Sequence, residues 1–195
     1  LALNAGLLTL LIGIPIVNEA LIYTGGTLIF IATTLLIAQL RSMRPKEPIQ
    51  AAAAPGHHTG RRFYLAGLSF FLLGIILGTG LWFGWGGWLF VQVPLEAHIH
   101  DNNWGLMSLV FAGILVDTYA SWAGRPLAWP RSITPIFWLM TFGALGLVLG
   151  VFLHRYVMGQ AEMDIIMFGR SVYPLSFVYS AALTMLFGVL VDLIL

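Results

Sequence analysis

The chain has 195 residues and a formal net charge of +1; 59% of its residues are hydrophobic and only 9% are charged. Soluble domains carry about 25% charged residues, so this composition excludes a soluble globular enzyme, a disordered tail and a nucleic-acid-binding domain. Cysteine is absent, which excludes disulfides and thiolate metal ligands. Composition and length together predict an all-α integral membrane protein with six transmembrane helices in one bundle, embedded in a lipid bilayer.

Apolar runs in chain order give the predicted spans: residues 1–17, 20–40, 63–83, 104–122, 133–153 and 172–195. The first run is short. A tight turn is expected after it, at Pro15 and Asn18-Glu19, because proline ends helices and polar side chains are unfavourable in hydrocarbon. Because the chain begins and ends inside apolar runs, we expect it to be part of a longer protein.

The segment 45–62 divides the predicted chain into a two-helix hairpin, residues 1–44, and a four-helix bundle, residues 63–195. Its alanine, proline and glycine content is typical of a linker. Seven of the nine lysine and arginine residues lie in or next to this linker or between the fourth and fifth spans, which alternation places on one side. The positive-inside rule then makes the 45–62 linker cytoplasmic, in a bacterial or archaeal inner or plasma membrane.

The densest polar cluster precedes the fourth span, on the predicted outer face, and includes Glu96, His98, His100 and Asp101. Ionisable groups near a membrane span are functional candidates. On an ideal helix the two histidines point about 200° apart and cannot share one ion. In an extended segment they would point to the same side and could share one.

Two further interpretations of this cluster remain open. One histidine could face inward and bind haem or a metal, while the carboxylate of Glu96 or Asp101 orients its other ring nitrogen. Alternatively, Asp101, Asn102 or Asn103 caps the start of the fourth span, and the histidines lie at the interface without a ligand.

Other ionisable residues give weaker candidates. His154 ends the fifth span on the same outer face and could complete a metal site with His98 or His100. His57 and His58 lie in the linker and are expected to be solvated. Asp117 lies near the inner end of the fourth span, where it either contributes to a proton path or is wetted at the interface. The candidate metal ligands are thus His98, His100, His154, Glu96 and Asp101, and no catalytic residue can be assigned.

Several short motifs follow the histidines: His98-x-His100, Trp104-Gly105-Leu106, Ala112-Gly113-Ile114-Leu115, Ala123-Gly124-Arg125-Pro126-Leu127 and Phe137-Trp138. This stretch, to Gly150, resembles the NnrS family and related small membrane proteins similar to haem–copper oxidase subunit I. The N-terminal span resembles the span that follows such a motif in the same families. The resemblance implies a polytopic protein that binds haem b or copper, is linked to nitric-oxide or respiratory metabolism, and has His98 and His100 as its ligands.

The sequence departs from that pattern at Asp101-Asn102-Asn103, which are more polar than the family pattern leads one to expect. The chain also has fewer inward histidines than a complete oxidase site requires. Reduction of oxygen or nitric oxide is therefore not expected of these residues alone. The alternative function is an accessory structural subunit of a larger respiratory, photosynthetic or monooxygenase membrane complex, with other membrane subunits as partners and no active site of its own.

Overall fold

The computed structural model describes residues 1–43, 59–83, 95–124, 129–153, 165–167, 170–172 and 174–194. Its helices are α1 (Ala2–Gly13), α2 (Glu19–Ser42), α3 (Thr59–Phe83), α4 (Leu95–His100), the π-helical segment η1 (Asp101–Met107), α5 (Ser108–Ala123), the 3₁₀ turn η2 (Pro130–Ser132), α6 (Ile133–Leu153) and α7 (Pro174–Ile194). A short antiparallel hairpin joins β1 (Ile165–Met167) and β2 (Arg170–Val172). The predicted helical class is confirmed.

Three segments are long and apolar enough to cross a membrane: Glu19–Ser42, Gly60–Leu81 and Pro130–Phe152. These segments match three of the predicted spans, and they support a membrane protein. Six spans in one bundle remain a prediction.

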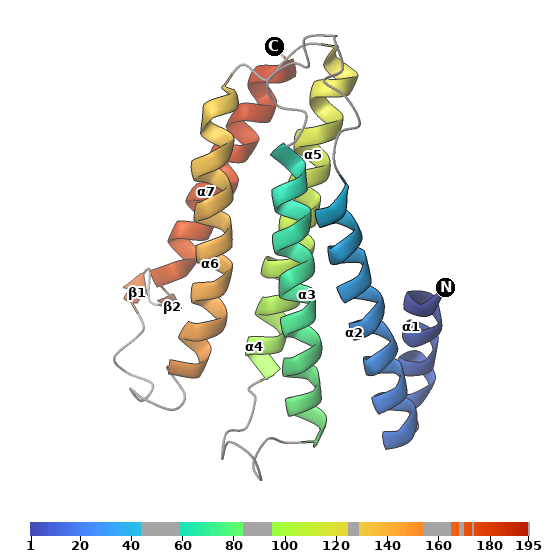
Figure 1. Ribbon diagram of the computed structural model, residues 1–195. Coiled ribbons are helices and arrows are strands. Elements are labelled where there is room, and N and C mark those ends of the chain that lie inside the picture. Colours follow the sequence, from blue (N-terminus) through green and yellow to red (C-terminus); the bar gives the residue numbers. More distant parts are fainter. Residues whose placement is uncertain are drawn as a thin grey trace.

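The first two helices form an antiparallel pair at one side of the molecule, in which α2 packs on α3 and α1 packs on α2 (Figure 1). Their backbones approach closely where Gly6 faces Gly25: a β-carbon on Gly6 would lie 2.9 Å from the carbonyl oxygen of Gly25. Asn18 starts α2 as an N-cap, because its Oδ1 accepts a hydrogen bond from the backbone N–H of Leu21 at 3.1 Å. The predicted turn between the first two spans is therefore present.

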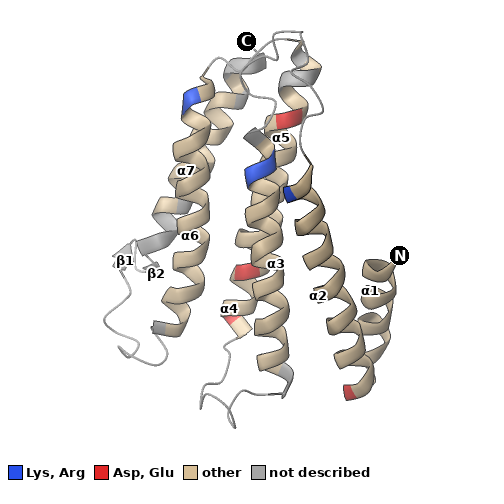
Figure 2. Ribbon diagram, viewed as in Figure 1, with Lys and Arg blue, Asp and Glu red and all other residues tan. Residues whose placement is uncertain are grey.

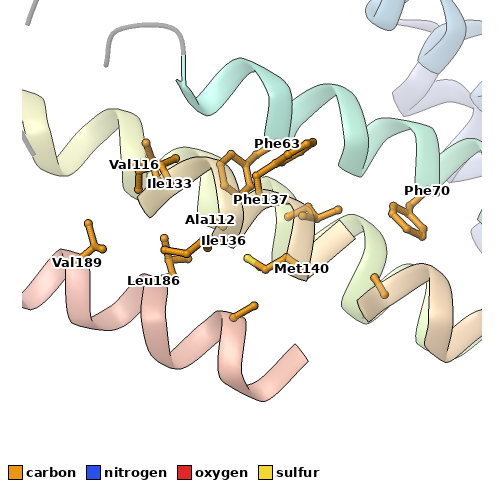
Figure 3. Packing of buried hydrophobic residues seen from close by; sticks show 13 residues of the cluster. Phe63, Phe70, Ala112, Val116, Ile133, Ile136, Phe137, Met140, Leu186 and Val189 are labelled. Carbon is orange, nitrogen blue, oxygen red and sulfur yellow. The ribbon is translucent and has the colours of Figure 1, made fainter. Parts of the chain in front are cut away.

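The main hydrophobic core lies between α3, α5, α6 and α7. Figure 3 shows Phe63 of α3 and Phe137 of α6 meeting in this core, with ring centroids 5.1 Å apart in an edge-to-face arrangement. Val116 comes from α5 and Leu186 from α7, and both are almost completely buried. This core holds α3 and α5 in a fixed register along their axes, and it thereby sets which residues of α3 lie opposite α4 and η1.

The fourth predicted span begins earlier than expected. The chain is helical from Leu95 through η1 to Ala123, so the helix does not start at Trp104. The cap interpretation of Asp101, Asn102 and Asn103 is wrong, since these residues lie within a continuous helical segment. The extended arrangement that would bring the two histidines to one side is excluded for the same reason.

Positive side chains gather at one end of the described structure, near the ends of α2, α3 and α6 (Figure 2). Arg61 donates from Nη2 to the carbonyl oxygen of Arg41 at 2.8 Å. Arg62 donates from Nη1 to Thr134 Oγ1 at 2.9 Å, and its guanidinium lies 5.7 Å from the ring centroid of Phe137. This end therefore carries the described members of the basic set predicted on the cytoplasmic side, which are Arg41, Arg61, Arg62 and Arg131, and α4 lies nearer the opposite end.

Candidate functional site

The two histidines of α4 lie on opposite flanks of its buried face. Ala97 is completely buried and packs with Leu77, Val148 and Val151, so it marks the side of α4 that faces α3 and α6. At about 100° per residue, His98 and His100 fall on either side of the direction in which Ala97 points, because they lie one and three positions after it. His98 and His100 therefore cannot bind the same ion.

His98 lies against α3. Its Cε1 is 3.1 Å from the point that a β-carbon on Gly78 would occupy. The amide nitrogen of Asn102 is 3.3 Å from both ring nitrogens, Nδ1 and Nε2. A well-aligned hydrogen bond to one ring nitrogen would leave the other nitrogen clearly farther from the amide. Because the two distances are equal, the Asn102 amide does not lie in line with either ring nitrogen.

His100 has a different environment. Its Nδ1 is 2.6 Å from the carbonyl oxygen of Glu96, one helical turn earlier. A carbonyl oxygen only accepts hydrogen bonds, so Nδ1 carries the proton and the neutral ring keeps its lone pair on Nε2. This is the arrangement found behind metal-ligating histidines, in which the second nitrogen donates to a carbonyl or carboxylate. The orienting group is the backbone carbonyl of Glu96 and not its side-chain carboxylate, which the sequence had suggested for this role.

Asp101 is completely buried, with 0% of its surface exposed. Within the described part of the chain, neither of its carboxylate oxygens has a hydrogen-bond partner. Asp101 therefore does not orient the ring of His98 or His100. Its Oδ2 faces α3, 2.6 Å from the β-carbon position of Gly74.

Glycines on α3 make room for this polar cluster. A β-carbon on Gly74 would collide with Asp101 and Asn102, and one on Gly78 would press on the His98 ring. Farther along the same face, Gly67 allows Val110 to approach, with its Cγ2 at 2.7 Å from the β-carbon position. The glycines of this helix form a packing face, and they let α3 and η1 lie close together.

Asp117 is satisfied by α3. Its Oδ1 accepts a hydrogen bond from the backbone N–H of Gly60 at 3.2 Å, and its Oδ2 accepts one from the hydroxyl of Tyr64 at 2.9 Å. The first bond satisfies a backbone donor at the start of α3, where helices leave such donors free. The sequence did not identify Tyr64 as the hydrogen-bond donor to Asp117, because the sequence of one helix does not show which side chain of another helix lies opposite it.

The candidate metal ligands do not converge. Across residues 1–43 and the described ranges that follow, no three histidine or acidic side chains are close enough to hold a metal ion together. His154, His57 and His58 lie outside the described residues. A metal site that combines His98, His100, Glu96 and Asp101 is therefore absent from this part of the protein.

Comparisons with protein-family models, with curated proteins and with solved structures found no match. The likeness to the NnrS family thus depends on the sequence motifs alone.

Proposed function

We propose that this chain is a haem- or copper-binding integral membrane protein of the NnrS or oxidase-like type, in which His98 and His100 each bind a separate group. The observation that carries the proposal is the hydrogen bond from His100 Nδ1 to Glu96, which leaves Nε2 free to act as a ligand. The partly buried His98 ring adds a second candidate nitrogen on the opposite flank.

The donor set favours haem over copper. The iron of a haem requires a single protein ligand on one side, and one imidazole is a common choice. A copper ion needs several protein ligands, and no three suitable side chains meet in the described residues. A bound haem would supply electron transfer or binding of a small molecule at its iron. The chain itself supplies the ring nitrogen and its orientation by a backbone carbonyl.

The location of these histidines supports the predicted orientation in the membrane. The described arginines at the ends of α2, α3 and α6 lie at one end, and α4 lies toward the other (Figure 2). With the basic end in the cytoplasm, His98 and His100 are on the outer side of a bacterial or archaeal plasma membrane.

The test is a visible absorption spectrum of the detergent-purified protein, with iron and copper analysis of the same sample. We expect a Soret band that is lost or shifted in His100→Ala and altered in His98→Ala. His57→Ala, in the predicted linker, is the matched control and should keep the wild-type spectrum. The proposal is wrong if the wild type contains neither haem nor copper, or if both α4 variants keep the full cofactor. In that case the accessory-subunit function becomes the better explanation.

A further inference from the structure

Three helices bring arginines together at the basic end of the structure (Figure 2). Arg41 lies near the end of α2, Arg61 and Arg62 lie in the first turn of α3, and Arg131 lies in η2, directly before α6. Arg61 joins α3 to α2, because its Nη2 donates to the Arg41 carbonyl oxygen at 2.8 Å. Arg62 joins α3 to α6, because its Nη1 donates to Thr134 Oγ1 at 2.9 Å. The four positive charges therefore lie on one connected surface.

The described residues offer these arginines few acceptors. Asp117 is the acidic residue whose side chain is described near this end (Figure 2). Its two oxygens accept hydrogen bonds from the Gly60 N–H and the Tyr64 hydroxyl. A guanidinium carries five N–H donors, and the buried Nε of Arg61 has no partner among the described residues. The basic end thus has more positive charge and more donors than this part of the protein satisfies.

The arginines are placed where membrane-spanning segments would meet the lipid headgroups. All four are among the first or last three residues of the segments that are long and apolar enough to cross a membrane, which are Glu19–Ser42, Gly60–Leu81 and Pro130–Phe152. Trp122 at the end of α5 and Trp129 directly before η2 are 79% and 63% exposed. Exposed tryptophans are typical of the membrane–water interface. Lipid phosphates are therefore the anions expected next to these arginines.

We propose that the basic end binds the headgroup of an anionic phospholipid, in the leaflet that this end faces. Planar guanidiniums donate paired hydrogen bonds to phosphate oxygens, and positive side chains near a membrane surface attract anionic lipids. A zwitterionic lipid carries the same phosphate together with a cation, which the arginines repel. The basic end lies away from α4, so this site is independent of the proposed haem or copper binding.

The protein holds two of the guanidiniums in place before a lipid binds. Arg61 is fixed by its hydrogen bond to the Arg41 carbonyl. Arg62 is fixed by Thr134 and by the ring of Phe137, whose centroid is 5.7 Å from the guanidinium carbon. Fixed donors lose less side-chain freedom on binding, which favours a bound headgroup over loosely attracted counterions.

The experiment compares thermal unfolding of the detergent-purified chain with added phosphatidylglycerol, phosphatidylcholine or inorganic phosphate, at equal concentration and ionic strength. We expect the unfolding midpoint to rise with the concentration of phosphatidylglycerol, because a ligand that binds only the folded state stabilises it. No comparable rise is expected with phosphatidylcholine or inorganic phosphate. The proposal is overturned if phosphatidylglycerol has no effect or if phosphatidylcholine has an equal one. An equal effect of inorganic phosphate also overturns it, because the ligand would then be a free anion.

Variants assign the effect to the basic end. The double variant Arg41→Gln and Arg131→Gln removes two exposed charges and leaves the hydrogen bonds of Arg61 and Arg62 in place. The phosphatidylglycerol concentration needed for half of the midpoint shift should rise about fivefold for each arginine removed, and thus about 25-fold. Arg170→Gln removes the same charge from β2, which lies outside the basic end (Figure 1), and should leave that concentration unchanged. An unchanged double variant, or an equal loss in Arg170→Gln, would contradict the assignment.

Discussion

At the scale of single residues, the aspartates at positions 101 and 117 illustrate opposite solutions to the same physical problem. Asp117 accepts hydrogen bonds from a backbone N–H and from Tyr64, so both of its oxygens are satisfied within the protein. Asp101 is more deeply buried and has neither kind of donor among the described residues. The first carboxylate therefore has a structural role in holding α3, while the second is buried without a hydrogen-bond partner among the described residues.

The structural role of Asp117 leads to a prediction. Tyr64→Phe removes the donor to Oδ2 and should lower the free energy of unfolding by about 1–3 kcal/mol, the cost of leaving a partly buried acceptor unpaired. The unfolding midpoint in detergent measures the change. Ser69→Ala is the control, because the Ser69 hydroxyl bonds only to the Leu65 carbonyl within its own helix. A Tyr64→Phe midpoint equal to that of the control would show that the bond contributes nothing.

At the scale of helices, the sequence predicts where a helix lies along the chain better than which of its residues another helix buries. The fifth predicted span, 133–153, coincides with α6, because its residues are apolar throughout and nothing competes with helix formation. The fourth span was predicted to start at Trp104, since Asp101 and Asn102 are polar and were expected to lie outside the hydrocarbon. Asp101 and Asn102 can be buried because Gly74 of α3 has no side chain where they pack. The sequence of one helix does not show which surface of another helix it will pack against.

The glycine surface of α3 can be tested by comparing two substitutions. Gly74→Ala places a β-carbon 2.6 Å from Asp101 Oδ2 and should destabilise the protein by about 1–3 kcal/mol through overpacking. Gly26→Ala meets nothing within 4 Å and should be neutral or stabilising by up to about 1 kcal/mol. Thermal unfolding of both variants measures the difference. If both substitutions are neutral, α3 and η1 do not approach as closely as the structure shows.

At the scale of the whole molecule, orientation can be measured directly because the chain has no cysteine. Met43→Cys places a thiol on an exposed residue at the basic end, and Leu95→Cys places one on an exposed residue of α4. A maleimide that cannot cross membranes should label the Leu95 variant on intact cells or spheroplasts and the Met43 variant only after permeabilisation. Labelling in the reverse order would place the candidate histidines on the cytoplasmic side.

The contact between α2 and α3 has a consequence for how the chain can be assembled. Arg61 reaches back to the Arg41 carbonyl, and α2 packs on α3 near this end, so α2 and α3 have contacts of their own besides the connection through residues 45–58. Two separately produced polypeptides, one ending after α2 and one beginning before α3, should therefore find each other in the bilayer and copurify. Such split-chain complementation would make the N-terminal hairpin an exchangeable module of the protein.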